Sequence, residues 1–129
     1  MRVNVVRKDP IEEIAKERDR RLAYGFVFDG KRFQADDRSR ANIGFAVGMA
    51  ARMNDTVAGS GSMVWIAADN AKVAMLPQTI IAFGDAAMTF ASEMYLAART
   101  LKDLIKSGEA LDIEDDALWP DLNRDRKEI

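Results

Sequence analysis

The chain has 129 residues, of which 48% are apolar and 31% are charged, values typical of a single folded domain. It contains no cysteine and no histidine, which excludes disulfides, thiol chemistry and cysteine-bound zinc and removes the commonest general base. The net charge is −2, from 19 basic and 21 acidic residues, so the composition lacks the basic excess typical of nucleic-acid binding. We therefore expect a protein that is not an enzyme, with no cofactor, no small-molecule substrate and no nucleic-acid partner.

Residues 1–9 are expected to form an N-terminal arm. Val3 and Val5 would share one face of a short strand, which could join a distant strand or a neighbouring subunit. A loosely ordered arm is the alternative. The segment is too short and too interrupted to be the apolar region of a signal peptide, so we expect the chain to be made and folded in a cytoplasm.

Asp9 and Pro10 predict the start of a first helix, because Asp is a frequent N-cap and Pro favours the first helical position. Gly25 is expected to end this helix as a left-handed cap. Glu–Lys and Glu–Arg pairs four residues apart are expected to support its exposed surface. The apolar stripe is narrow, which fits a helix packed on its own domain or a coiled-coil seam between chains; it consists of Ile11, Ile14, Arg18 and Leu22.

A hairpin followed by a helix occurs twice, and the two units are 40 residues apart. Residues 26–33 form the first predicted hairpin, with a two-residue turn at Asp29-Gly30. Residues 64–73 form the second, with a two-residue turn at Asp69-Asn70. The chain is therefore predicted to be α+β, with small antiparallel sheets packed on a long C-terminal helix. One four-stranded sheet and two separate ribbons both remain open.

The helices behind the hairpins are predicted over about 38–53 and from Pro77 to about Ser107. Gly44 and Gly48 in the first of them suggest that another helix or strand approaches closely. The apolar face of the second is wider than two small hairpins can cover, so another helix or a second chain should pack along it. Charged residues interrupt that apolar stretch, so we expect a core helix and no membrane partner; they are Asp85, Glu93 and Arg99.

Three patterns could carry chemistry, and each has a simpler interpretation. The acidic residues Asp112, Glu114, Asp115 and Asp116 lack the glycine and the final Glu of a calcium loop, which favours a solvated segment. The 59–62 stretch has glycines but no following Lys, which favours a connector over a phosphate site. The hairpin aromatics favour core packing over a nucleic-acid platform; they are Phe26, Phe28, Phe33 and Trp65.

Residues 10–120 are predicted to form one domain, followed by a polar tail at 121–129. Trp119 is expected to anchor the end of the domain to the core. Contacts with other proteins are expected at the arm, at the stripe of the first helix and on the surplus face of the last helix. The candidate protein-contact residues are Val3, Val5, Ile11, Ile14, Leu22, Tyr95 and Ile105.

The order of the motifs resembles a family known as a domain of unknown function of tailed bacteriophages and prophages, found in or beside tail fibre and tail proteins. The similarity covers roughly residues 11–120 and is carried by Gly25-Phe26-Val27-Phe28-Asp29-Gly30 with Phe33, Asp36, Ser39 and Ile43, and by Trp65 with Asp69-Asn70. The family has no established catalytic or ligand residues, so none is transferred to this chain.

The resemblance implies a virion structural protein, made in the host bacterial cytoplasm, that lies in or near the phage tail and contacts other tail proteins. It also implies self-association, with a trimer as the first expectation because tail fibres are commonly trimeric. A tail-fibre assembly chaperone that is absent from the finished particle is the alternative.

Overall fold

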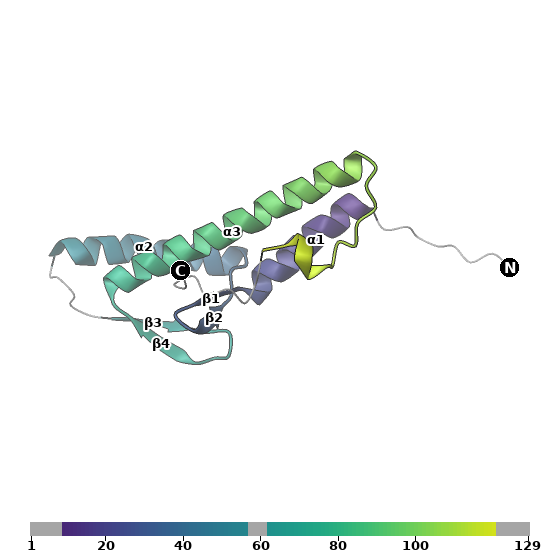
Figure 1. The fold of residues 1–129 in the computed structure, drawn as a ribbon. Coiled ribbons are helices and arrows are strands. Elements are labelled where there is room, and N and C mark those ends of the chain that lie inside the picture. The colour runs from purple at the N-terminus through teal and green to yellow at the C-terminus, as the bar shows by residue number, and fades with distance from the viewer. Residues whose placement is uncertain (1–8, 57–61, 121–129) are drawn as a thin grey trace.

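The computed structural model describes residues 9–56 and 62–120, and its elements confirm the α+β class (Figure 1). The predictions for Val3, Val5, the 121–129 tail and most of the 59–62 stretch fall outside these residues. Three helices, two hairpins and a short 3-10 helix follow one another in this order: α1 (Pro10–Tyr24), β1 (Phe26–Phe28), β2 (Lys31–Phe33), α2 (Asp37–Thr56), β3 (Met63–Ile66), β4 (Lys72–Met75), α3 (Pro77–Lys106) and η1 (Asp116–Leu118).

The start of α1 confirms the predicted cap. The Asp9 carboxylate accepts a hydrogen bond from the Ile11 N–H at 2.9 Å, and Pro10 is the first helical residue. Gly25 ends the helix with φ 104°, but its ψ of −165° is extended. Gly25 therefore has the predicted positive φ, but its ψ is not that of a left-handed helical cap. The reason is that the chain continues from α1 directly into strand β1.

The first hairpin confirms the predicted turn. Asp29 and Gly30 have φ values of 52° and 78°, and a type I′ turn requires positive φ at both central residues. Strands β1 and β2 are antiparallel, with Phe26 opposite Phe33. Both rings therefore lie on the same face of the ribbon, and this face is buried.

The second hairpin has a longer turn than predicted. Only Asn70 has positive φ, at 69°, and its N–H donates to the Ala67 carbonyl at 2.9 Å. The Asp69 carboxylate accepts the Ala71 N–H at 3.0 Å, and this hydrogen bond lowers the pKa of Asp69. The loop therefore contains three residues, Ala68 to Asn70, because Asp69 keeps negative φ and a two-residue type I′ turn cannot form.

The two hairpins are separate two-stranded ribbons rather than one sheet. Two contacts connect them at the turn of the second hairpin. The Ala68 N–H donates to the Arg32 carbonyl at 2.8 Å, and the Lys31 ammonium lies 3.4 Å from the Asp69 carboxylate. The repeat of 40 residues is retained in the helix starts at positions 37 and 77.

Helix α3 is the centre of the fold, with α2 beside its N-terminal half and α1 beside its C-terminal half (Figure 1). The buried side of α3 is therefore covered by helices and hairpins of the same chain, whereas Tyr95, Leu96 and Leu104 at the margin of its apolar face are exposed. Phe83 of α3 is fully buried, and its ring centroid lies 4.8 Å from that of Phe33 and 5.7 Å from that of Phe26. The core interpretation of these hairpin aromatics is confirmed. Next to them, Gly84 lets the Val47 side chain of α2 approach α3 closely.

Candidate interaction surface

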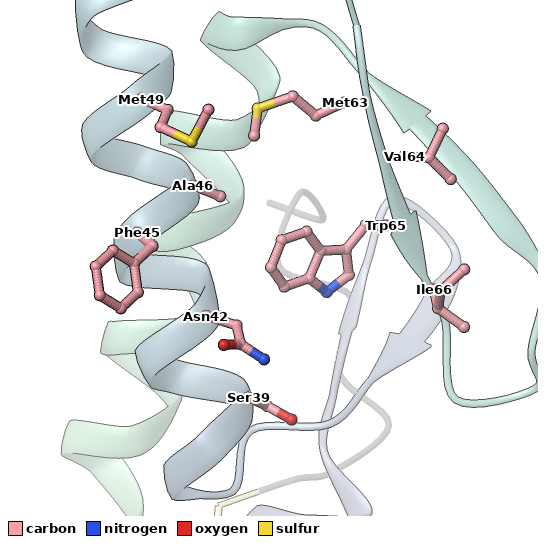
Figure 2. Close-up of a pocket in the computed structure, with 9 residues that line it drawn as sticks. All are labelled: Ser39, Asn42, Phe45, Ala46, Met49, Met63, Val64, Trp65 and Ile66. Carbon is pink, nitrogen blue, oxygen red and sulfur yellow. The ribbon is translucent and has the colours of Figure 1, made fainter.

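An open apolar groove of about 500 Å³ lies between α2 and β3 (Figure 2). Figure 2 shows the Trp65 indole pointing from β3 toward α2, and Met49 and Met63 approaching each other at one end of the groove. The groove is lined by Ser39, Asn42, Phe45, Ala46, Met49, Met63, Val64, Trp65 and Ile66. We call this set the apolar groove.

Large apolar side chains are exposed on both elements that form the apolar groove. Phe45 is 77% exposed and Met49 is 48% exposed on α2. On β3, Val64 and Ile66 are more than half exposed and point away from α2 (Figure 2). Within the described residues β3 pairs only with β4, so its second edge has no strand partner. Exposed apolar side chains beside an unpaired strand edge are typical of a protein interaction site.

The chemistry of the apolar groove favours binding. None of its nine lining residues has an ionisable side chain. Its polar side-chain groups are the Ser39 hydroxyl and the Asn42 amide on α2 and the Trp65 indole N–H on β3 (Figure 2). The Ser39 hydroxyl already donates to the Asp36 carboxylate. Such a lining suits an apolar segment with one or two hydrogen bonds, and it offers no group for acid–base catalysis.

Trp65 links the apolar groove to the core. Its ring is partly buried and meets Phe83 edge-on, with 5.5 Å between centroids. We expect Trp65→Ala to lower the free energy of unfolding by about 2–3 kcal/mol, below the 3–5 kcal/mol of a fully buried ring. Urea unfolding measures this change, and Trp65→Phe is the matched control because it keeps a ring against Phe83. A loss below about 1 kcal/mol for Trp65→Ala would contradict the packing role.

A second cluster fixes the segment 109–120, which we call the C-terminal strap, against α1 (Figure 1). Arg21 is buried, and its guanidinium donates to the Glu17 carboxylate at 2.6 Å, to the Asp116 carboxylate at 2.7 Å and to the Glu114 carbonyl at 3.0 Å. It also lies over the Trp119 ring. The buried charge is therefore fully paired, as a stable buried cation must be.

The carboxyl group of Glu17 is also buried in this cluster. Burial would raise the pKa of Glu17, but hydrogen bonds from Arg20 and Arg21 outweigh it and hold the pKa below its ordinary value. Because the pKa of Glu17 is lower in the folded chain than in the unfolded chain, ionised Glu17 stabilises the fold at pH values above its unfolded pKa. This stabilisation is lost as the pH falls through the pKa of Glu17 in the folded chain. Protonation of Glu17 in acid therefore weakens this cluster and, with it, the attachment of the C-terminal strap.

Trp119 is the predicted anchor, and the structure confirms it. Its indole N–H donates to the Ile113 carbonyl at 2.7 Å, and its side chain is buried. The neighbouring acidic residues have local roles, since Asp112 and Asp115 accept backbone N–H groups and Asp116 pairs with Arg21. Across residues 9–56 and 62–120, no three Asp or Glu side chains gather in a way that could hold a metal ion.

The predicted protein-contact residues of the described chain do not form one surface. Ile14 and Leu22 are core residues of this chain, so their place on a contact surface is corrected: the stripe of α1 packs on α3 of its own domain. Ile11 and Ile105 are partly buried. Tyr95 is 40% exposed, and its ring lies under the guanidinium groups of two arginines, Arg18 and Arg40.

Sequence reasoning missed the exposed residues of α2 and β3. Phe45 and Met49 are four residues apart, so they lie on one side of α2, away from the buried Ile43 and Ala50. That spacing was visible in the sequence. It did not indicate exposure, because the periodicity alone cannot say which apolar side of a helix faces the core.

Residues 5–120 match the family model of a domain of unknown function, DUF4376. The chain belongs to the DUF4376 family. No curated protein and no solved structure is significantly similar to it. In the described part of this DUF4376 domain, no helix has the length and apolar character needed to cross a membrane.

Proposed function

We propose that this chain is a non-enzymatic structural protein of a tailed bacteriophage, located in or near the tail of the virion and acting through protein–protein contacts. The observation that carries the proposal is the motif order described above, in which Gly25-Phe26-Val27-Phe28-Asp29-Gly30 precedes Trp65 and Asp69-Asn70. This order resembles a family found in or beside phage tail proteins. The partners would be other tail proteins and further copies of the same chain.

The apolar groove supports a role in binding proteins. It has exposed apolar walls, no ionisable lining residue and a strand edge without a partner in the described chain. A segment of another tail protein could bury the exposed Met49 side chain and the partly buried Trp65 ring, which stabilises an assembly by about 25 cal/mol for each Å² of apolar area removed from water.

A tail-fibre assembly chaperone is the second candidate, and the methionines of the apolar groove favour it. Met49 and Met63 line one end of the groove. Methionine has a flexible, polarisable side chain that adapts to different partners, and such lining is typical of proteins that bind many sequences. A chaperone would bind fibre chains during assembly and leave before the particle is complete.

Mass spectrometry of purified virions from the phage or induced prophage that encodes the chain separates the two candidates. We expect the chain in the particle at a copy number that matches the symmetry of the tail. A known capsid protein and a known non-structural phage protein from the same lysate serve as controls. If the chain is abundant in the lysate but absent from particles, the structural proposal fails and the chaperone becomes the first candidate. If, in addition, purified fibre chains fail to retain this chain, the structural proposal and the chaperone proposal both fail.

A further inference from the structure

Helix α2 has an exposed face that no other element of the described chain covers. One side of α2 faces the core, because it carries the buried Ile43, Ala46 and Ala50. On the opposite side, exposed residues recur from Asp37 to Arg52 at the 3–4-residue spacing of one helix face. We call this set the outer α2 face; it consists of Asp37, Ala41, Gly44, Phe45, Gly48 and Arg52.

The described chain does not explain the composition of the outer α2 face. A Cβ atom added at Gly44 or Gly48 would meet nothing within 4 Å, and neither glycine has positive φ. Each glycine therefore weakens α2 by about 1 kcal/mol relative to alanine with no packing gain in the fold. Phe45 beside them is 77% exposed. No helix or strand of the described residues makes the close approach that the sequence suggested at these two glycines.

We propose that the outer α2 face binds the same face of a second copy of the chain, with the two α2 helices antiparallel about a two-fold axis. When the axis passes near Phe45, the two Phe45 rings lie side by side. In this register the axis passes between Gly44 and Phe45, so each Phe45 lies opposite the partner's Gly44. Ala41 then lies opposite the partner's Gly48, and Asp37 lies opposite the partner's Arg52, because the two members of each pair are equally far from the axis. The glycines let the two helix backbones approach closely.

The charges at the two ends of the face favour a second copy over a different partner. Asp37 stands at the start of α2 with a side chain 93% exposed, and Arg52 is exposed near the other end. A contact about a two-fold axis uses the same patch on both copies, so the patch must be complementary to itself. An antiparallel pair of α2 helices meets this condition, because Asp37 of one copy lies opposite Arg52 of the other at each of its two ends. A basic face, as a lipid surface would favour, is absent from these six residues.

The size of the contact sets the expected affinity. One helix pair buries less area than the roughly 800 Å² per partner of a standard interface. We therefore expect reversible association in the micromolar range or weaker, driven by Phe45 and the close backbone contact. Because the contact is two-fold, it joins copies in pairs, whereas a three-fold ring would need a different surface. This pairing does not depend on the proposed virion role.

Sedimentation equilibrium of the full chain over a range of concentrations tests the pairing. We expect a monomer–dimer equilibrium for the native chain and a dimer dissociation constant raised at least about tenfold by Phe45→Glu. Met88→Glu is the matched control, because Met88 is 58% exposed on α3, outside the outer α2 face. It should leave the constant unchanged. Thermal melting by circular dichroism verifies that each variant folds.

Charge reversal tests the antiparallel register. Asp37→Arg and Arg52→Asp should each weaken the dimer, and the double variant should restore it, because it recreates both pairs with opposite polarity. Such rescue would not follow from a local effect on α2, where Asp37 also pairs with Arg40. The proposal is overturned by a native chain that stays monomeric, by a trimer, or by a dimer that Phe45→Glu does not weaken. It is also overturned if the double variant is as weak as the single ones.

Discussion

Replacing Gly25 with alanine is expected to destabilise the chain more than the same change at any other glycine that the structure describes, by at least about 3 kcal/mol. Gly25 has φ 104° and ψ −165°, a region that is essentially limited to glycine. A Cβ atom there would overlap the Phe33 carbonyl oxygen and lie 2.6 Å from its carbon. Both are backbone atoms of β2, so no side-chain rotation can relieve the overlap. Thermal unfolding measures the loss.

Gly108→Ala is the control that separates the two causes. Gly108 also has positive φ, at 98°, but a Cβ atom there would meet nothing within 4 Å. Its replacement should therefore show backbone strain alone, about 1 kcal/mol. If Gly25→Ala and Gly108→Ala proved equally mild, the close approach of α1 and β2 at Gly25 would be refuted.

Phe83→Ala is expected to lower the free energy of unfolding by about 3–5 kcal/mol, the range for a fully buried aromatic ring. Phe83 has no exposed surface, and its ring contacts both hairpins, with Phe28 at 5.3 Å and Trp65 at 5.5 Å between centroids. Alanine would leave a cavity where the two ribbons meet α3. The measurement is urea unfolding at equilibrium, with the midpoint and slope fitted together.

Phe45→Ala removes the same atoms from an exposed site, so it is the matched control for Phe83→Ala. It should change stability by less than about 0.5 kcal/mol at concentrations where the chain is monomeric, since Phe45 is 77% exposed. Equal losses at the two positions would mean that Phe83 does not hold the two ribbons on α3.

The features that local chemistry determines were predictable from the sequence. Asp9 and Pro10 fixed the start of α1, and Asp29-Gly30 fixed the first turn, because the preferences of these residues act over a few positions. The same reasoning placed the start of α3 at Pro77. The second turn failed because Asn70 alone takes positive φ, and a side-chain hydrogen bond at Asp69 competes with the two-residue form.

The features that depend on distant contacts were not predictable in this way. The sequence could not decide between one sheet and two ribbons, since pairing of separate hairpins is non-local. Glu17 and Arg21 were expected to pair on the surface of α1, and they do pair, but in a buried cluster with Asp116. Ile14 and Leu22 were assigned to a contact surface because a narrow stripe cannot show that α3 already covers it.

The attachment of the C-terminal strap has a consequence for the order of folding. Arg21 holds Glu114 and Asp116 across 93 and 95 positions of sequence, whereas the hairpins form from neighbouring residues. Closing so long a loop is slow, and the Arg21 contacts that stabilise the closed loop can form only after α1 and α3 have docked. We therefore expect the strap to be the last of the described segments to be fixed and the first to detach. Its amides should exchange with solvent through a small local opening that leaves the ribbons and α3 closed.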